Sequence, residues 1–249
     1  MSTESRSPLE LFEIAYDSEG DAYSDVLREL HWSGERVTFE IARAWAFDPD
    51  ELRRIVGLDV LGQLGIAQSA RRSHWPHRPE TIELLRRILQ DPNVPLDVLE
   101  SAIVSAGHQS ARALLHDVIA FVDHPDDDIR SAVTFAVSSL RVFADDDGDL
   151  YPAAPEIVDT LIHLCADDVA EIREWALFHL RILEDDQAPN ESPGALAAYL
   201  AGVEDEDEDV RLEARQALEA LGLRSEPRIG RLSRPMTRRR RAHRRSRRR

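Results

Sequence analysis

The sequence contains no lysine, one cysteine, few glycines and few aromatic residues. All 31 basic residues are arginine, 11 residues are glycine and 6% are aromatic. Strands favour aromatic residues and their turns favour glycine, so this scarcity argues against a β-sandwich or barrel. A single thiol excludes an internal disulfide, and we expect Cys165, in the run LIHLC, to be buried and inert.

Long apolar runs are also absent. No stretch of 18 apolar residues is present to span a bilayer. The start, MSTESRSPLELFE, lacks the basic and apolar parts of a secretory signal. We therefore expect a cytoplasmic protein that does not contact membranes.

Motifs that carry out catalysis or hold cofactors are missing as well. The sequence contains no His-Glu dipeptide, GxSxG, P-loop, HExxH or CxxC. The run DDDGDLYPAAPE has its glycine fourth, whereas a calcium-binding EF-hand loop has it sixth, so an acidic surface loop is the better interpretation. We expect no enzymatic activity, no cofactor and no metal site.

The sequence does contain a repeated pattern: a short acidic turn, an aliphatic residue, an arginine, and then small and apolar residues at helical spacing. The clear copies are HPDDDIRSAVTFAVSSL from His124, ADDVAEIREWALFHLRIL from Ala166 and DEDEDVRLEARQALEALG from Asp205. Their arginines, Arg130, Arg173 and Arg211, are 43 and 38 residues apart. Such a period is typical of two-helix repeats that stack into a superhelix.

Segments between these copies have apolar residues at i, i+3, i+4 and i+7, which predicts partner helices. These helices cover residues 79–90, 111–122, 155–165 and 193–203, and looser copies of the repeat begin at Asp48 and Asp91. Further predictions are a first hairpin, residues 21–32 and 36–47, and a capping helix, residues 9–16. The predicted fold is all-α, an α-solenoid of about five to six stacked helical hairpins.

The acidic turns have a structural role, because an aspartate just before a helix caps free backbone N–H groups. The four-residue spacing of Asp126 and Arg130 also predicts that they lie on one side of the helix start, and so does that of Asp207 and Arg211. The last helix, residues 209–221, is expected to lack the second helix of its hairpin.

The motif D-P-D-x-x-V-R followed by A-x-x-A-L resembles the HEAT repeat, in particular the short bacterial, phycobilisome-lyase-type variety, over about residues 20–222. GLDVLGQLG and IREWALFHL also resemble uncharacterised bacterial HEAT-repeat proteins. The resemblance implies an adaptor or binding scaffold. Enzymes of this architecture need features that are missing here: an iron hydroxylase needs His-Glu pairs, and a DNA glycosylase needs a basic concave face.

Three regions follow from these patterns. Residues 1–19 form an N-terminal segment or capping helix, residues 20–222 the solenoid, and residues 223–249 an arginine-rich tail. Within the solenoid, the loop QSARRSHWPHR, residues 68–78, is long and basic where its neighbours are short and acidic. We predict partner contacts at Arg71, Arg72, His74, Trp75 and His77. The alternatives are a metal site at the two histidines and an ordinary loop packed by the tryptophan.

A second aromatic group has two interpretations. Trp175 and His179 lie four residues apart on one predicted helix, and Phe135 has a roughly equivalent place in the preceding repeat. These rings either line a groove as an aromatic stripe or pack between consecutive hairpins. Core packing is the favoured interpretation.

The two parts of the chain differ in charge. Residues 223–249 hold 13 arginines and one acid, Glu226, a net charge of +12, whereas the rest has 18 arginines against 46 acidic residues, a net charge of −28. We expect the tail to be disordered alone and able to bind phosphate backbones. Its candidate contacts are Arg238, Arg239, Arg240, Arg241, Arg244, Arg245, Arg247, Arg248 and Arg249. Alternatives are a tail folded back on the acidic body, a solubility or sorting segment, and an out-of-frame end.

These observations favour a non-catalytic scaffold that binds a macromolecule through its repeat surface. A protein partner is the first expectation, and the negative body favours a basic one. The alternative is a nucleic-acid-associated protein that binds through the arginine-rich tail.

Overall fold

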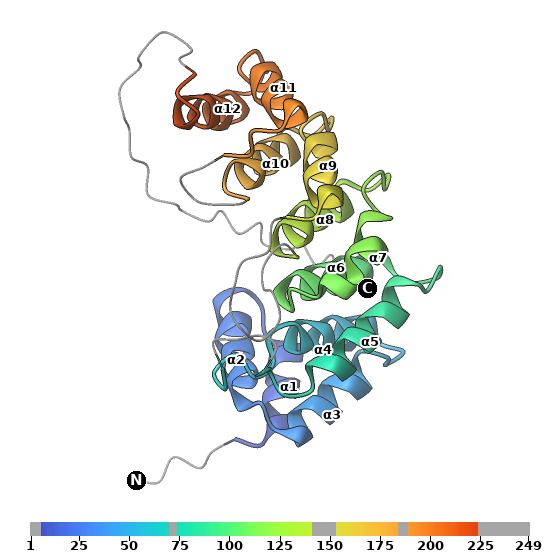
Figure 1. Cartoon of the computed structure of the whole chain (residues 1–249). Helices are drawn as coiled ribbons and strands as arrows, with labels where there is room; N and C mark the ends of the chain where they lie inside the picture. The colour runs from blue at the N-terminus through green and yellow to red at the C-terminus, as the bar shows by residue number, and fades with distance from the viewer. Residues whose placement is uncertain (1–5, 70–73, 141–152, 184–188, 224–249) are drawn as a thin grey trace.

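The computed structural model describes residues 6–69, 74–140, 153–183 and 189–223, and their regular secondary structure is helical (Figure 1). The helices of the first half are α1 (Pro8–Asp17), α2 (Gly20–Ser33), α3 (Arg36–Trp45), α4 (Glu51–Gln63), α5 (Arg78–Leu89) and α6 (Leu96–His108). Those of the second half are η2 (Arg112–Leu114), α7 (Leu115–Ile119), α8 (Asp127–Ser139), α9 (Pro155–Leu164), α10 (Ala170–Arg181), α11 (Pro193–Gly202) and α12 (Glu208–Ala220). None of these helices is long and apolar enough to cross a membrane.

The helices from α3 onward pair into five stacked hairpins, which confirms the predicted α-solenoid. The pairs are α3 with α4, α5 with α6, α7 with α8, α9 with α10, and α11 with α12. We call the first helices the A layer and the second helices the B layer; the two layers lie side by side along the stack (Figure 1). The B layer is continuous, because α4, α6, α8, α10 and α12 each contact the next. The helices α1 and α2 pack on its N-terminal end. A cap was predicted for α1 alone. The predicted first hairpin of α2 with α3 is wrong, because α3 pairs with α4, and α2 contacts α1 and α4.

Two predictions about individual helices are wrong. The last helix does not lack a partner, because α12 pairs with the preceding helix α11. Each arginine-bearing helix is the second of its hairpin, and our sequence interpretation had taken it as the first. The helix predicted over residues 111–122 is broken into η2 and the single turn of α7. Ser110, just before it, has a positive φ of 45°, which ends α6 and displaces the next helix start.

The acidic turns cap the helices as predicted. The Asp126 carboxylate accepts hydrogen bonds from the backbone N–H groups of Asp128 and Ile129 at 3.1 and 3.3 Å. The Asp207 carboxylate makes the same pair of contacts at the start of α12. Asp50 caps α4 through the backbone N–H of Arg53, whereas α6 and α10 begin at Pro95 and Val169 without a side-chain cap.

Glycine allows the closest approach of two helices in the first hairpin. A Cβ atom added to Gly57 of α4 would lie 2.6 Å from the backbone nitrogen of Ala46 and 2.7 Å from the carbonyl oxygen of Ala42. Backbone atoms cannot move aside as a flexible side chain does. The contact between α3 and α4 therefore requires glycine at this position.

We predict that Gly57→Ala destabilises the protein by about 1–3 kcal/mol, although alanine favours a helix by about 1 kcal/mol, because the added methyl group separates α3 from α4. Urea unfolding measures the change. Gly194→Ala is the matched control, since a Cβ there meets the terminal carbon of the Ile162 side chain, which can rotate away. Equal effects of the two substitutions would contradict the prediction.

Candidate interaction surface

An arginine in each of the last three turns holds the backbone of its own turn, and the first two of these arginines, Arg130 and Arg173, also reach the next repeat. The Nη1 atom of Arg173 donates to the carbonyl oxygens of Asp167 and Asp168 at 2.8 and 3.2 Å. Its Nε and Nη2 atoms donate to the two carboxylate oxygens of Asp205, both at 2.8 Å. Asp205 lies in the turn of the following hairpin, so one side chain connects two repeats.

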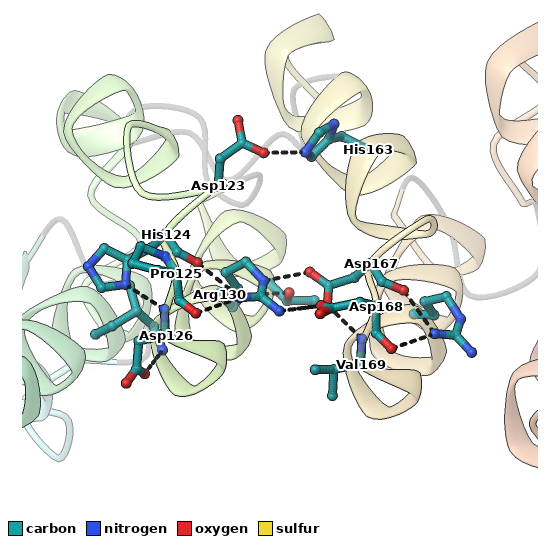
Figure 2. A network of polar contacts seen from close by, with 12 residues as sticks. Asp123, His124, Pro125, Asp126, Arg130, His163, Asp167, Asp168 and Val169 are labelled. Carbon is teal, nitrogen blue, oxygen red and sulfur yellow. Dashed lines mark hydrogen bonds and ion pairs between the residues drawn. The ribbon is translucent and has the colours of Figure 1, made fainter.

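Arg130 repeats this geometry one hairpin earlier (Figure 2). Its Nη1 atom donates to the carbonyl oxygen of His124 at 2.9 Å, and its Nε and Nη2 atoms donate to the Asp167 carboxylate at 2.7 and 3.0 Å. Asp168 accepts a further contact at 2.6 Å. We call these successive contacts the arginine ladder.

The ladder corrects our prediction for the charged pairs at the helix starts. The sequence spacing had placed Asp126 beside Arg130 and Asp207 beside Arg211. Both aspartates instead cap their own helices, and the arginine side chains extend from the helix start across the turn. Arg130 then reaches a carboxylate of the next repeat, which sequence spacing within one helix does not reveal.

The ladder is an architectural feature and not a binding site, because its polar groups already contact one another. The Arg173 and Asp205 side chains are 10% and 14% exposed. The hydrogen bonds from Arg173 lower the pKa of Asp205, and burial opposes this shift. Removing one partner of such a bidentate pair destabilises the folded protein, because the other partner keeps its charge in a largely buried position.

The loop chosen from the sequence as a partner site is largely engaged in packing. Trp75 is 4% exposed and its indole N–H donates to the carbonyl oxygen of Ser69 at 2.9 Å, so it is not an exposed anchor. His77 has a φ of 65° and stacks on Phe39 with ring centroids 4.6 Å apart. His74 is exposed.

Other predicted residues lie outside the described ranges. Arg71, Arg72, the run from Asp145 to Asp149 and all nine tail arginines are in this group. In the described ranges, Asp126, Asp127 and Asp128 form the one group of three or more residues with clustered potential metal ligands. Because Asp126 caps α8, this cluster is explained by the helix start.

Aromatic side chains lie on helices of the B layer. His108 of α6 meets Phe135 of α8 edge to face, with centroids 5.1 Å apart. On α10, Trp175 stacks on His179 at 5.7 Å and meets Phe178 edge to face at 5.5 Å. We call these five rings the B-layer stripe.

The two interpretations of these rings apply to different residues. Phe135 meets His108 of the preceding hairpin, in agreement with the favoured packing between hairpins, whereas Trp175 contacts His179 and Phe178 of its own helix. The core of α10 consists of Ile172, Ala176, Leu177 and Leu180, all buried. Trp175 is 38% exposed, whereas Phe135 and Phe178 are half-buried. The rings therefore pack on one another at the surface of the layer, which makes Trp175 available to a ligand.

Carboxylates surround Glu174, the residue before the exposed tryptophan. Burial, together with the charges of Asp209, Glu213, Asp207 and Glu171, raises the pKa of Glu174 to about 7. Arg181 lies nearby but is already bound to Glu213 at 2.9 Å. Burial and the neighbouring acids between α10 and α12 thus both oppose ionisation of Glu174.

The sequence analysis did not identify Glu174. Its environment comes from α10 and the next turn together, so no local motif reveals it. One sequence signal was available, the position of Glu174 in the repeated pattern. Glu174 directly follows the ladder arginine Arg173, on the side of the helix that faces the next repeat.

The sequence matches no protein-family model and no curated protein. Solved structures are similar in fold. The Escherichia coli protein YibA aligns with a TM-score of 0.64 at 20% identity, over 86% of this chain and 70% of that one. An archaeal HEAT-like repeats protein from Thermococcus onnurineus NA1 aligns with a TM-score of 0.50 at 16% identity, over 91% and 85%.

A designed armadillo repeat protein in complex with the peptide (KR)4 has a TM-score of 0.54 at 15% identity, over 87% of this chain and 99% of that one. These structures are HEAT-like and armadillo solenoids, which confirms the predicted fold class. At these identities the likeness establishes the fold alone.

We predict that Arg173→Ala lowers the free energy of unfolding by about 3–5 kcal/mol, because it leaves the buried Asp205 carboxylate without its partner. The control is Arg28→Ala, whose ion pair with Asp25 is mostly exposed and should contribute less than about 1 kcal/mol. Urea unfolding of both variants at neutral pH makes the comparison. A small loss for Arg173→Ala would show that the ladder does not hold the repeats together.

We predict that Glu174→Gln stabilises the protein at pH 8 and has little effect at pH 4.5. With the folded pKa raised to about 7, the folded chain retains a proton that the unfolded chain has lost, so stability falls as the pH rises through this window. Thermal melts at both pH values measure the difference. Glu29→Gln, at an exposed position of α2, should show no such pH dependence.

Proposed function

We propose that this protein is a non-catalytic scaffold that binds an extended, basic polypeptide segment along the B layer. The observation that carries the proposal is Trp175, an exposed ring beside Glu171 and Glu174 on the same helix. An arginine or lysine side chain of a partner can lie over the indole while its charge remains close to these carboxylates. In such a contact, the indole ring and the carboxylates both attract the cationic side chain of the partner.

The charge balance of this surface supports a cationic ligand. Arg181 is occupied by Glu213 and lies over Phe178, with its guanidinium carbon 5.3 Å from the ring centroid. Burial raises the pKa of Glu174 to about 7, and repulsion from neighbouring acids contributes to the shift. A bound cation would relieve that repulsion, so we expect the affinity for a basic segment to rise between pH 6 and pH 8.

The similar structures agree with this kind of ligand. The designed armadillo repeat protein is in complex with an alternating lysine-arginine peptide, (KR)4. Because the identity is 15%, its contacts are not transferred residue by residue. The shared feature is a helical repeat surface long enough for an extended chain.

Nucleic acid is the second candidate, and a separate feature favours it. The basic residues of the tail can neutralise phosphates, whereas the B layer beside Trp175 is acidic and repels them. Binding of nucleic acid would therefore depend on residues 224–249 and not on the solenoid. Cytoplasmic location and the absence of catalysis remain predictions.

Binding of a fluorescent (Lys-Arg)4 peptide to the full chain tests the proposal. Loss of the indole in Trp175→Ala should weaken binding about fivefold, since a cation on an exposed ring contributes about 1 kcal/mol. Trp32→Ala is the matched control, because Trp32 of α2 is 60% exposed and distant in sequence from the stripe. Binding should also weaken as salt is added.

Two outcomes would contradict the proposal: no binding of the peptide, or equal affinities for Trp175→Ala and Trp32→Ala. A labelled DNA duplex in the same assay addresses the alternative. Tight binding of the duplex that is unchanged in Trp175→Ala and lost in a chain ending at Leu223 would assign the function to the tail.

A further inference from the structure

The last two hairpins align with each other without a gap. This alignment shows which side of the last hairpin would face another repeat. A shift of 38 residues aligns the ladder arginine Arg173 with Arg211 and requires no gap from α9 through α12. The same shift relates four other pairs: Ile162 with Leu200, Glu174 with Leu212, Leu177 with Arg215, and Arg181 with Glu219.

Each first member of these pairs faces the hairpin that follows it. Ile162 lies 2.8 Å from the position of a Cβ on Gly194, and Leu177 lies 3.0 Å from that on Gly202. The ladder contact of Arg173 and the ion pair of Arg181 both end on the last hairpin. The acids that raise the pKa of Glu174 also belong largely to that hairpin.

The second members form the C-terminal end face: Leu200, Arg211, Leu212, Arg215 and Glu219. Leu200 is 55% exposed and Leu212 49% exposed. Arg211 still donates to the carbonyl oxygens of Asp205 and Glu206 at 2.7 and 2.8 Å. Among the described residues, however, no carboxylate takes the place that Asp205 has beside Arg173.

The end face does not have the composition of a simple cap. A terminal repeat needs a polar outer surface, and the exchange of Leu177 for Arg215 fits that need. The pair of Glu174 and Leu212 makes the end face less polar. The last hairpin has an apolar side chain where the preceding repeat has a carboxylate. Leu200 likewise keeps the apolar character of Ile162, and among the described residues no further hairpin covers it. Exposed apolar groups beside an arginine without a carboxylate are typical of an interface.

We propose that a second copy of this chain covers the C-terminal end face, forming a symmetric dimer. Arg211, Arg215 and Glu219 follow one another at four-residue intervals, so they lie along one side of α12. A second α12 laid antiparallel across this side, with Arg215 at the centre, brings Glu219 of each copy opposite Arg211 of the other. The face is thus complementary to itself, as a twofold interface requires. Leu200 and Leu212 supply its apolar part.

The chain's own tail fits the end face less well. Residues 224–249 contain one acid, Glu226, and 13 arginines. They would therefore place positive charge against Arg211 and Arg215 while leaving the carboxylate position beside Arg211 mostly unfilled. The basic segment proposed for the B layer would also place positive charge against Arg211 and Arg215. The B layer and the C-terminal end face therefore take different partners.

Sedimentation equilibrium of the full chain over a concentration series tests the dimer, which should have twice the 28.2 kDa mass of the chain. We expect Leu212→Glu to weaken association about tenfold or more, because it puts a charge in the apolar part of the interface. The matched control is Leu9→Glu, at a leucine of α1 that is 52% exposed at the other end of the solenoid. It should leave the dissociation constant unchanged.

Charge exchange tests the orientation of the two copies. Glu219→Arg should weaken the dimer, since it places arginine opposite Arg211, and the double variant R211E/E219R should restore it. Arg215→Ala should strengthen the dimer, because it removes a like-charged pair at the symmetry axis. Thermal melts of each variant show whether the last hairpin remains folded, since Arg211 also holds its own turn.

A full chain that stays monomeric at the highest concentration reached overturns the proposal. So does a dimer that Leu212→Glu and Leu9→Glu affect equally, or one that Arg215→Ala weakens. These outcomes are independent of peptide binding at Trp175, so the dimer and the proposed function can fail separately.

Discussion

The bidentate contact between an arginine of one repeat and an aspartate of the next is the interaction on which the arrangement of the last three hairpins depends. Arg130 with Asp167, and Arg173 with Asp205, each fix the distance between consecutive turns while the other side of the guanidinium holds two backbone carbonyls of its own turn. The apolar core provides most of the stabilisation, but it is non-directional and tolerates sliding. Between the last three hairpins, the ladder adds a directional constraint on their spacing.

That constraint also determines where charge remains available for a ligand. Aspartates of the turns are used for caps and for the ladder, so they are neutralised or hydrogen-bonded where they stand. Between α10 and α12, burial and the charges of neighbouring acids together raise the pKa of Glu174. Trp175, the next residue, is exposed, so a basic segment bound there gains both attraction by these acids and aromatic contact.

Features encoded within one helix or one turn were predicted from the sequence, whereas features that depend on two repeats were not. Helical periodicity gave the solenoid and nearly every helix, and Asp126 and Asp207 cap helices as their position before an apolar run indicates. Three features depend on packing between segments distant in sequence. They are the pairing of the helices into hairpins, the contact that the Arg130 side chain makes, and the burial of Trp75. Spacing along one helix carries no information about such contacts, because the partner belongs to another element.

The two ends of the stack follow from the same physics. Every interior hairpin buries one side against its predecessor and the other against its successor, so a finite stack always leaves two sides that the repeat pattern alone would expose. At the N-terminal end, α1 covers that side, and Phe12 and Ala15 are fully buried there. At the C-terminal end, the described chain adds no helix after α12. The change from Leu177 to Arg215 reduces the apolar surface, but Leu200 and Leu212 preserve part of it next to an arginine with no carboxylate from a following repeat. A face that keeps both halves of the repeat interface, apolar contact and ion pairing, retains the capacity to bind what an interior hairpin binds, which is another repeat of the same kind.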